Sequence, residues 1–308
     1  MDQLTSSHHF EIGCYIFRVT ATSCFNLPKF KGSTFHGGLA GGLNLVGNRF
    51  LNLFYYPKKT SAQQSSNHFL PKPFMIIPPL EEKTYYQSGD SIEFGIVLFG
   101  GAARHFMIVF AAIENLGNLL GIGRDQGRFK IEKVLLLSLE KPAVIFENDT
   151  WFSFPKKMTI QDILETHQVG ASWVSISLMT QLRLKDSNRL VRHPPDFSLL
   201  FKRLMGRINT LTAIYGDGVL VQKPALNLLE TLTHRIRLDK RRTNVRWIDW
   251  SRPIAHKEKK EIYGGLIGEI AYSGNLTPFI PWLALGQWTG LGGKTSFGLG
   301  LYDLKYNI

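Results

Sequence analysis

Histidine is the side chain best suited to acid–base chemistry near neutral pH, because its ordinary pKa lies close to neutrality. The chain has nine histidines, and His36 stands out among them. It lies in the sequence GSTFHGG that begins at Gly32, at the start of a stretch that we predict to be helical. Its glycine neighbours would leave a bound molecule room to approach. His36 is therefore a candidate base or acid, and the alternative is a histidine that packs or caps the helix.

Cations and phenols near this first predicted helix could assist such chemistry. Lys29 and Lys31 lie just before the helix, where either could neutralise a phosphate. Tyr15 is a candidate for acid–base work or for stacking, as are Tyr55 and Tyr56. The alternative for each is the ordinary one, a surface lysine or a core tyrosine. No HExxH motif, Asp-rich cluster or zinc-type His/Cys spacing occurs, so the sequence predicts no metal site and no cofactor.

A dense basic segment lies in the C-terminal half. Between His234 and Lys260 there are ten Lys/Arg and only three Asp/Glu, and the whole chain carries a net charge of +12. Trp247 and Trp250 are interleaved with these cations. Basic groups beside aromatic rings suit RNA, because cations meet phosphates and rings stack on bases; the alternative is a solvated basic hairpin. The predicted RNA contacts here are Arg235, Arg242, Arg252, His256, Lys257, Lys259 and Lys260, with Lys29 as a further candidate.

A glycine-rich stretch, GLGGKTSFGLG at Gly290–Gly300, follows a predicted helix and precedes a predicted strand. A nucleotide-binding P-loop has the reverse order, and its spacing also fails here, because the required first glycine falls on Trp288. Glycines let backbone N–H groups approach a phosphate closely, and a lysine adds positive charge. The alternative is a tight turn that only needs positive φ. The predicted phosphate contacts are Gly292, Gly293, Lys294 and Thr295.

These candidates must be positioned by a fold whose elements repeat. Each half of the chain reads strand, helix, strand, strand, helix, strand, which is the order of a ferredoxin-like domain. We therefore predict an α+β fold of two tandem ferredoxin-like (RRM-like) domains, residues 1–145 and 171–308, joined by a linker over 146–170. The predicted strands are 9–20, 74–77, 91–99, 128–137, 173–184, 245–250, 262–272 and 297–306; the predicted helices are 35–45, 103–120, 160–166, 197–215, 224–237 and 278–290.

Three local interpretations bear on the predicted site. Ser33 or Thr34 is expected to cap the first helix. Residues 48–69 are polar, aromatic and irregular, and we predict no helix there. In the first strand, alternate residues are expected to mark the apolar face; these residues are Phe10, Ile12, Cys14, Ile16 and Thr20.

Composition restricts the class of protein. With 308 residues, 44% apolar and 19% charged, the chain is expected to form a globular core in one large or two medium domains. Two cysteines cannot make a disulfide framework. The most apolar window, Phe94–Ile113, is interrupted by Arg104 and His105, so no membrane span is predicted, and the polar Met1–His9 shows no signal peptide. We expect a cytoplasmic protein that has a polyanionic partner and does not bind membranes.

The glycine-rich stretch and its surroundings resemble a known family. Gly290–Leu301 resembles the C-terminal glycine-rich loop of the RAMP superfamily of CRISPR-associated RNA-binding proteins, and the flanking sequences GNLTPFIP from Gly274 and GLGLY from Gly298 resemble it too. The resemblance touches both predicted domains. The segments that resemble the repeat-processing branch are PKPFMIIPPL from Pro71, FGIVLFG from Phe94, GNLLGIGRDQGRF from Gly117 and LMTQLRLK from Leu178.

The resemblance implies metal-independent cleavage of CRISPR repeat RNA, which converts precursor transcripts into guide RNAs. Such cleavage uses the RNA's own 2′-hydroxyl as nucleophile, leaves a 2′,3′-cyclic phosphate and a 5′-hydroxyl, and needs a base, an acid and a cation. In related enzymes a catalytic histidine often lies near the first helix, which favours His36, with Lys31 and Tyr15 as further catalytic candidates. Relatives commonly have arginine in place of His36 and a cysteine cluster after the helix, and this chain departs from both patterns.

Two alternatives remain open at this stage. One is a non-catalytic RAMP subunit that binds guide RNA in a CRISPR effector complex, with other effector subunits as partners. The other is a general RNA-binding module, which is weakened because no RRM signature of the K/R-G-F/Y-G/A-F-V-x-F/Y type occurs. A cleavage assay on the neighbouring repeat RNA separates the enzyme from the non-catalytic subunit.

Overall fold

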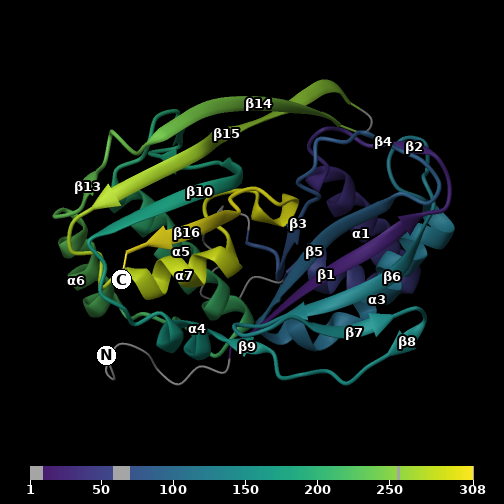
Figure 1. The fold of residues 1–308 in the computed structure, drawn as a ribbon, viewed down its shortest axis with the longest axis horizontal. Helices are drawn as coiled ribbons and strands as arrows, with labels where there is room; N and C mark the ends of the chain where they lie inside the picture. Colours follow the sequence, from purple (N-terminus) through teal and green to yellow (C-terminus); the bar gives the residue numbers. More distant parts are fainter. Residues whose placement is uncertain (1–9, 58–69, 255–256, 308) are drawn as a thin grey trace. The chain divides into compact units, whose positions relative to one another are not determined.

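The computed structural model describes residues 10–57, 70–254 and 257–307, with the side chains of 251–262 outside the description. The chain forms two compact units (Figure 1). The first comprises His9–Thr159 together with the tripeptide Ile214–Gly216. The second comprises Ile160–Ala213 and Asp217–Ile308. In the described residues, no helix combines the length and the apolar character that crossing a membrane requires.

The first unit is built on a seven-stranded antiparallel sheet. Its central strands lie in the order β3 (Phe74–Ile77), β5 (Ser91–Phe99), β1 (Glu11–Ala21) and β6 (Phe129–Leu137). With the helices between them in sequence, this order is ferredoxin-like, as predicted. The remaining strands of this unit are β2 (Phe25–Asn26), β4 (Tyr85–Tyr86), β7 (Ala143–Glu147), β8 (Thr150–Trp151) and β9 (Met158–Thr159).

The helices of the first unit pack on one face of this sheet. They are α1 (Gly32–Val46) and α3 (Phe106–Asn115), the latter flanked by the helical turns η2 (Gly100–His105) and η3 (Leu116–Leu120). The face of β1 that packs on them carries Tyr15, Phe17 and Val19. Phe10, Ile12 and Cys14, which were predicted to mark one face, lie on the other side of the strand and are also buried. The predicted Ser33 or Thr34 cap is wrong, because the helix begins at Gly32 with Lys31 as its N-cap residue and no side-chain cap bond.

Close packing explains most of the glycines of α1. A Cβ placed on Gly42 would lie 2.0 Å from the Ala112 carbonyl oxygen of α3. A Cβ on Gly38 or Gly41 would meet the side chains of the turn η3, at 2.7 Å and 3.0 Å respectively. Only Gly37 of these faces open space. The glycines therefore bring α1 and α3 together. Of the two glycines that follow His36, Gly37 leaves open space beside it, and Gly38 packs against Leu116.

A helix follows α1 where we predicted irregular chain. This helix, α2 (Asn48–Tyr55), begins directly after Gly47, whose φ of +152° breaks α1. Its buried residues are Phe54 and Tyr55, which join the core of the first unit. The segment is too short for its apolar spacing to be recognised in sequence, so contacts with α1 and β3 stabilise it rather than intrinsic helix propensity.

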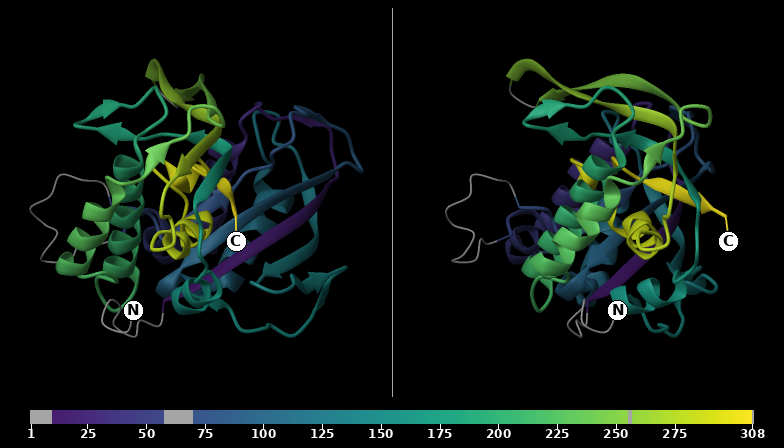
Figure 2. Two further views of the ribbon diagram at one scale, coloured as in Figure 1. Left: turned by 60° about the vertical axis from the view of Figure 1, so that its left-hand side comes forward. Right: turned by 90° about the vertical axis from the view of Figure 1, so that its left-hand side faces the viewer.

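The second unit repeats the ferredoxin-like order. Its sheet contains β14 (Asn244–Ile254), β15 (Lys257–Ser273), β10 (Trp173–Leu182) and β16 (Tyr302–Tyr306), paired in that sequence and all antiparallel. The helices α5 and α7 lie together on one side of this sheet (Figure 2). The helices and minor strands of this unit are α4 (Ile160–Thr166), α5 (Phe197–Tyr215), α6 (Lys223–Thr233), α7 (Ile280–Thr289), η4 (Thr295–Phe297), β11 (Lys185–Asp186), β12 (Arg189–Leu190) and β13 (Arg237–Leu238).

Strands and a helix occupy parts of the predicted linker over 146–170. Strand β7 extends the first sheet by pairing with β6, and β9 pairs with the start of β1. The helix α4, which was predicted at these residues, belongs to the second unit. The division between the units falls between Thr159 and Ile160, inside the predicted linker, and residues 152–157 form no helix or strand.

Candidate functional site

The glycine-rich loop is tied to the end of β10. The Gly293 amide donates to the Arg183 carbonyl at 2.8 Å, and the Gly300 amide donates to the Gln181 carbonyl at 3.0 Å. The loop closes on itself through a bond of 2.9 Å from the Leu291 amide to the Gly300 carbonyl. These bonds join both ends of the loop to each other and to the end of β10.

The tip contains residues with different constraints. Gly292 has a φ of +83°, and a Cβ there would lie 2.5 Å from the Arg183 carbonyl, so the fold itself requires this glycine. Gly293 is exposed, and a Cβ there would meet nothing closer than 3.6 Å. Lys294 is exposed in the left-handed conformation at a φ of +65°. Thr295 is buried at the start of η4, which places it away from the surface on which we predicted an RNA contact.

An aromatic pair lies under the loop. The Lys294 Nζ lies 5.1 Å from the ring centre of Tyr263 and 5.6 Å from that of Phe297. Tyr263 stacks on Trp250 with ring centres 4.7 Å apart and an interplanar angle of 16°. Tyr263 and Trp250 are cross-strand partners on β15 and β14. Through Tyr263, which is buried, the loop cation is linked to the side of the β14–β15 hairpin on which Trp250 lies. This contact connects two segments that were predicted separately from the sequence.

The other predicted RNA contacts of this segment are placed as follows. Arg242 is exposed, with its guanidinium 5.0 Å from the Trp173 ring centre and an ion pair to Asp239 at 3.8 Å. Arg235 and, in the first unit, Lys29 are exposed. The structure does not describe His256. It describes the backbone, but not the side chains, of Arg252, Lys257, Lys259 and Lys260.

His36 lies in the first unit on α1 and is largely covered. Its side chain is 8% exposed. The imidazole meets the Tyr55 ring edge-on with centres 4.9 Å apart, and the Phe74 ring at 5.8 Å. The Tyr55 phenol donates a hydrogen bond to the His36 backbone carbonyl. His36 therefore packs between α2 and β3 in this structure.

The two other predicted catalytic residues have no exposed surface. Tyr15 is 0% exposed and stacks on Phe106 with ring centres 3.9 Å apart, and burial raises the pKa of its phenol. Lys31 is also 0% exposed; its Nζ donates to the Glu81 carbonyl at 2.6 Å, and burial lowers its pKa while the Glu81 charge opposes that shift. A group that transfers a proton or neutralises a phosphate must touch the RNA, so these positions contradict the predicted roles of Tyr15 and Lys31.

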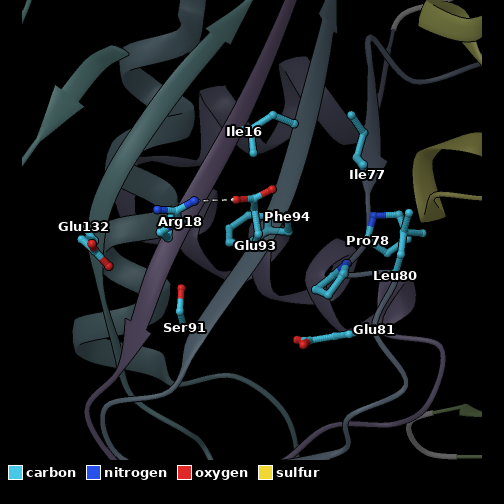
Figure 3. A pocket seen from close by; sticks show the side chains of 11 residues that line it. Ile16, Arg18, Ile77, Pro78, Leu80, Glu81, Ser91, Glu93, Phe94 and Glu132 are labelled. Carbon is cyan, nitrogen blue, oxygen red and sulfur yellow. Dashed lines mark hydrogen bonds and ion pairs between the residues drawn. The ribbon is translucent and has the colours of Figure 1, made fainter. Parts of the chain in front are cut away.

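The face of the first sheet opposite its helices carries a hollow of about 610 Å³ (Figure 3). Its charged lining consists of Arg18 with Glu81, Glu93 and Glu132, and Arg18 pairs with Glu93 at 3.4 Å. Prolines and aliphatic side chains, with Ser91 and Phe94, form the rest of the wall. With three carboxylates against one paired cation, this hollow repels phosphate.

Within residues 10–57, 70–254 and 257–307, no group of three His, Cys, Asp or Glu side chains is arranged so that it could hold a metal ion.

Two features of the second unit were missed in the sequence analysis. Tyr263 was placed only as a strand residue, and a tyrosine opposite a tryptophan on paired strands is the signal that could have identified the stack. The exposed hairpin formed by β11 and β12 carries no motif and was not predicted.

A family model matches most of the second unit. Residues 176–302 match the family model of the CRISPR-associated endoribonuclease Cas6. These residues, called the Cas6 segment below, include most of β10, the β14–β15 hairpin and the whole glycine-rich loop. The match confirms the predicted resemblance to RAMP-type repeat-processing endoribonucleases. Residues 48–159 match a second family model, described only as an N-terminal domain. A search of curated proteins found no match.

Solved structures show the same fold over nearly all of the chain. A chain of a partial Cas6-RT-Cas1–Cas2 complex is similar with a TM-score of 0.66 and 17% identity, over 98% of this chain and 47% of that chain. This protein thus spans about half the length of that one. Cas6 of Thermus thermophilus is similar with a TM-score of 0.60 and 14% identity, over 97% and 100%. A RAMP protein described as binding different RNA substrates has a TM-score of 0.51 and 10% identity, over 95% and 99%.

Proposed function

We propose that this protein binds CRISPR repeat RNA and cleaves precursor transcripts into guide RNAs, with other CRISPR proteins as further partners and the cytoplasm as its location. One observation supports this most strongly. The Cas6 segment places an exposed lysine, Lys294, at the tip of a loop whose two ends are fixed by hydrogen bonds, directly over the Trp250–Tyr263 stack. Tyr263 is buried, and Trp250 is the partly exposed ring of the pair. A cation close to a partly exposed tryptophan suits a phosphate and an unpaired base of RNA.

The proposed reaction needs no metal. A base takes the proton of the 2′-hydroxyl, the resulting oxygen attacks the adjacent phosphorus, and the bond from phosphorus to the 5′-oxygen breaks. An acid gives a proton to that 5′-oxygen, so the products carry a 2′,3′-cyclic phosphate and a 5′-hydroxyl. A nearby cation or N–H donor would stabilise the charge that develops on the phosphate.

His36 remains the proposed acid or base. It is the one predicted catalytic side chain with residual exposure, and Gly37 beside it faces open space. Because Tyr55 and Phe74 cover the imidazole, RNA can reach it only if α2 shifts from α1. The proposal therefore ties catalysis by His36 to a movement of the α2 helix.

A cleavage assay tests this function. The purified protein is incubated with RNA of its own neighbouring repeat, with and without EDTA, and the product ends are mapped. We expect a single cut, insensitive to EDTA, with a cyclic phosphate on one product. Loss of cleavage in EDTA would refute the metal-independent reaction.

A second candidate function is favoured by burial. Tyr15 and Lys31 have no exposed surface and His36 has little, which is the arrangement expected of a RAMP subunit that binds guide RNA without cutting it. In that case the wild-type protein binds the repeat tightly but leaves it intact under every condition that permits binding. The same assay decides between the two candidates.

A further inference from the structure

The small basic hairpin formed by β11 and β12 begins directly after Arg183, to which the glycine-rich loop is hydrogen-bonded. Arg183 joins the two: its carbonyl accepts the Gly293 amide at 2.8 Å, and its Nη1 donates to the Gly264 carbonyl of β15 at 2.9 Å. The strands β11 and β12 follow, closed by a bond of 3.0 Å from the Val191 amide to the Leu184 carbonyl. The hairpin is therefore fixed at its base to the same strand ends as the loop.

Three exposed cations belong to this hairpin and the residues just after it: Lys185, Arg189 and Arg192. In the described part of the chain none of the three forms an ion pair. The one carboxylate of the hairpin, Asp186, lies 3.9 Å from Arg203 of α5. Positive charge at this end of the second unit is thus exposed and not neutralised by the protein.

Arg192 is held in a defined position. Its guanidinium carbon lies 4.8 Å from the ring centre of Trp247. The indole is fixed in turn: its Nε1 donates to Asp249 at 2.8 Å, and it lies so close to β15 that a Cβ on Gly264 would come within 2.4 Å of it. A guanidinium stacked on a ring keeps its N–H donors at the edge, where they can bind a phosphate with two parallel hydrogen bonds.

The position of Trp247 places Arg192 across the hairpin from Lys294. Trp250 and its cross-strand partner Tyr263 lie on one side of the β14–β15 hairpin, and Lys294 lies over the Tyr263 ring. Because side chains alternate along a strand, Trp247 and Asp249 lie on the other side of the hairpin. A ligand that reaches both cations has to be long, flexible and repeatedly anionic. RNA meets all three conditions.

We propose that Arg192, positioned by Trp247, is a second phosphate-binding site for RNA, with Lys185 and Arg189 beside it. This inference rests on the proposed RNA function and adds to it a path: the RNA backbone straddles the β14–β15 hairpin, with one phosphate at Lys294 and another at Arg192. Arg192 binds the phosphate, and Trp247 acts through Arg192 as a positioning residue.

Binding of the repeat RNA, measured over a range of salt concentrations, tests the site. Arg192→Ala should weaken binding roughly tenfold, as expected for loss of a charge-assisted hydrogen bond, and should reduce the log–log salt slope by about 0.7–0.9. Arg192→Lys should keep the slope and lose affinity, because lysine lacks the planar fork. Lys202→Ala, an exposed cation on α5, is the matched control and should change neither beyond a small general effect.

A double-mutant cycle tests the role of Trp247. If Trp247 acts by holding Arg192, the effects of Trp247→Ala and Arg192→Ala on RNA affinity are not additive; additive effects would overturn that role. If Arg192→Ala binds RNA as Lys202→Ala does, the phosphate site is wrong while the proposed function stands. If Arg192→Ala instead loses an acidic protein partner at unchanged RNA affinity, the site binds protein. Failure of the wild type to bind repeat RNA would refute the proposed function itself.

Discussion

The Tyr55 phenol donates a hydrogen bond to the backbone carbonyl of His36, and its ring meets the His36 imidazole edge-on with centres 4.9 Å apart. This pair fastens α2 to α1 and covers the candidate catalyst in one contact. Burial raises the pKa of the Tyr55 phenol, so the donor stays protonated at physiological pH. Whether RNA can reach the His36 imidazole therefore depends on the position of α2.

Replacing His36 tests catalysis directly. His36→Ala should slow single-turnover cleavage by at least about 10²-fold, the lower range for a positioned acid or base. RNA affinity should change little, because the loop and hairpin that bind RNA in the proposal belong to the other unit. Rates at saturating protein, with binding measured separately, give both quantities.

Two control variants accompany His36→Ala. His167→Ala removes the histidine that directly follows α4, whose Nδ1 lies 2.9 Å from the Ile163 carbonyl, and should leave cleavage unchanged. Tyr55→Phe removes only the hydrogen bond that fastens α2, and should leave cleavage equal or faster. Cleavage by His36→Ala at the wild-type rate would place the catalyst elsewhere and exclude this assignment.

Tyr15→Phe separates a core residue from a catalyst. The Tyr15 hydroxyl is buried, and the described residues offer it no hydrogen-bond partner. A buried donor without a partner costs about 1–3 kcal/mol, so removing it should leave the free energy of unfolding unchanged or raise it. Denaturant unfolding measures this, and the cleavage rate should not change. A large drop in rate in a stably folded Tyr15→Phe protein would restore the catalytic role that the sequence predicted.

The pH dependence of stability tests the burial of Lys31. Since burial lowers its pKa, the unfolded chain binds more protons than the folded one between that lowered pKa and the ordinary value of 10.5. The contribution of Lys31 to the free energy of unfolding therefore rises with pH in this window. Lys31→Met should remove that rise, seen as a wild-type-minus-variant difference in denaturant unfolding. Equal pH slopes for the two proteins would mean that Lys31 is solvated.

The elements that could be predicted from sequence are those with strong local signals. Strand β3 was predicted with its observed bounds at Phe74–Ile77, since prolines flank it. Helix α5 was predicted with its observed bounds at Phe197–Tyr215, since six apolar residues recur there at helical spacing over a long run. The ferredoxin-like order followed from such elements. Helix α2 was missed because its stability comes from packing on α1, which is tertiary information.

The parts of the candidate site that could be predicted are also those with strong local sequence signals. Lys294 and Trp250 lie in conspicuous local patterns, a glycine-rich turn and a basic aromatic segment, and the structure brings them together through Tyr263. Burial of Tyr15 was not predictable, because β1 is apolar on both faces and the choice of the inward face depends on where α1 and α3 pack. If one face of β1 were polar, the sequence would have indicated which face points into the core. Burial of Lys31 was not predictable because it depends on a contact with Glu81, which is fifty residues away in the sequence.

The glycine-rich loop offers a paired test of structure against binding. Gly292→Ala places a side chain at a φ of +83° and 2.5 Å from the Arg183 carbonyl, so it should lower the free energy of unfolding by at least about 1–2 kcal/mol, the cost of a left-handed residue. Gly293→Ala meets nothing closer than 3.6 Å and should leave stability within about 0.5 kcal/mol of wild type, because its site is exposed. In the proposed RNA complex, its methyl group would stand where a phosphate approaches the backbone, so RNA affinity should fall. Denaturant unfolding and RNA titration of both variants give four values. If Gly293→Ala binds RNA with wild-type affinity, the loop is a turn that the fold requires at Gly292, and Lys294 alone contacts the phosphate.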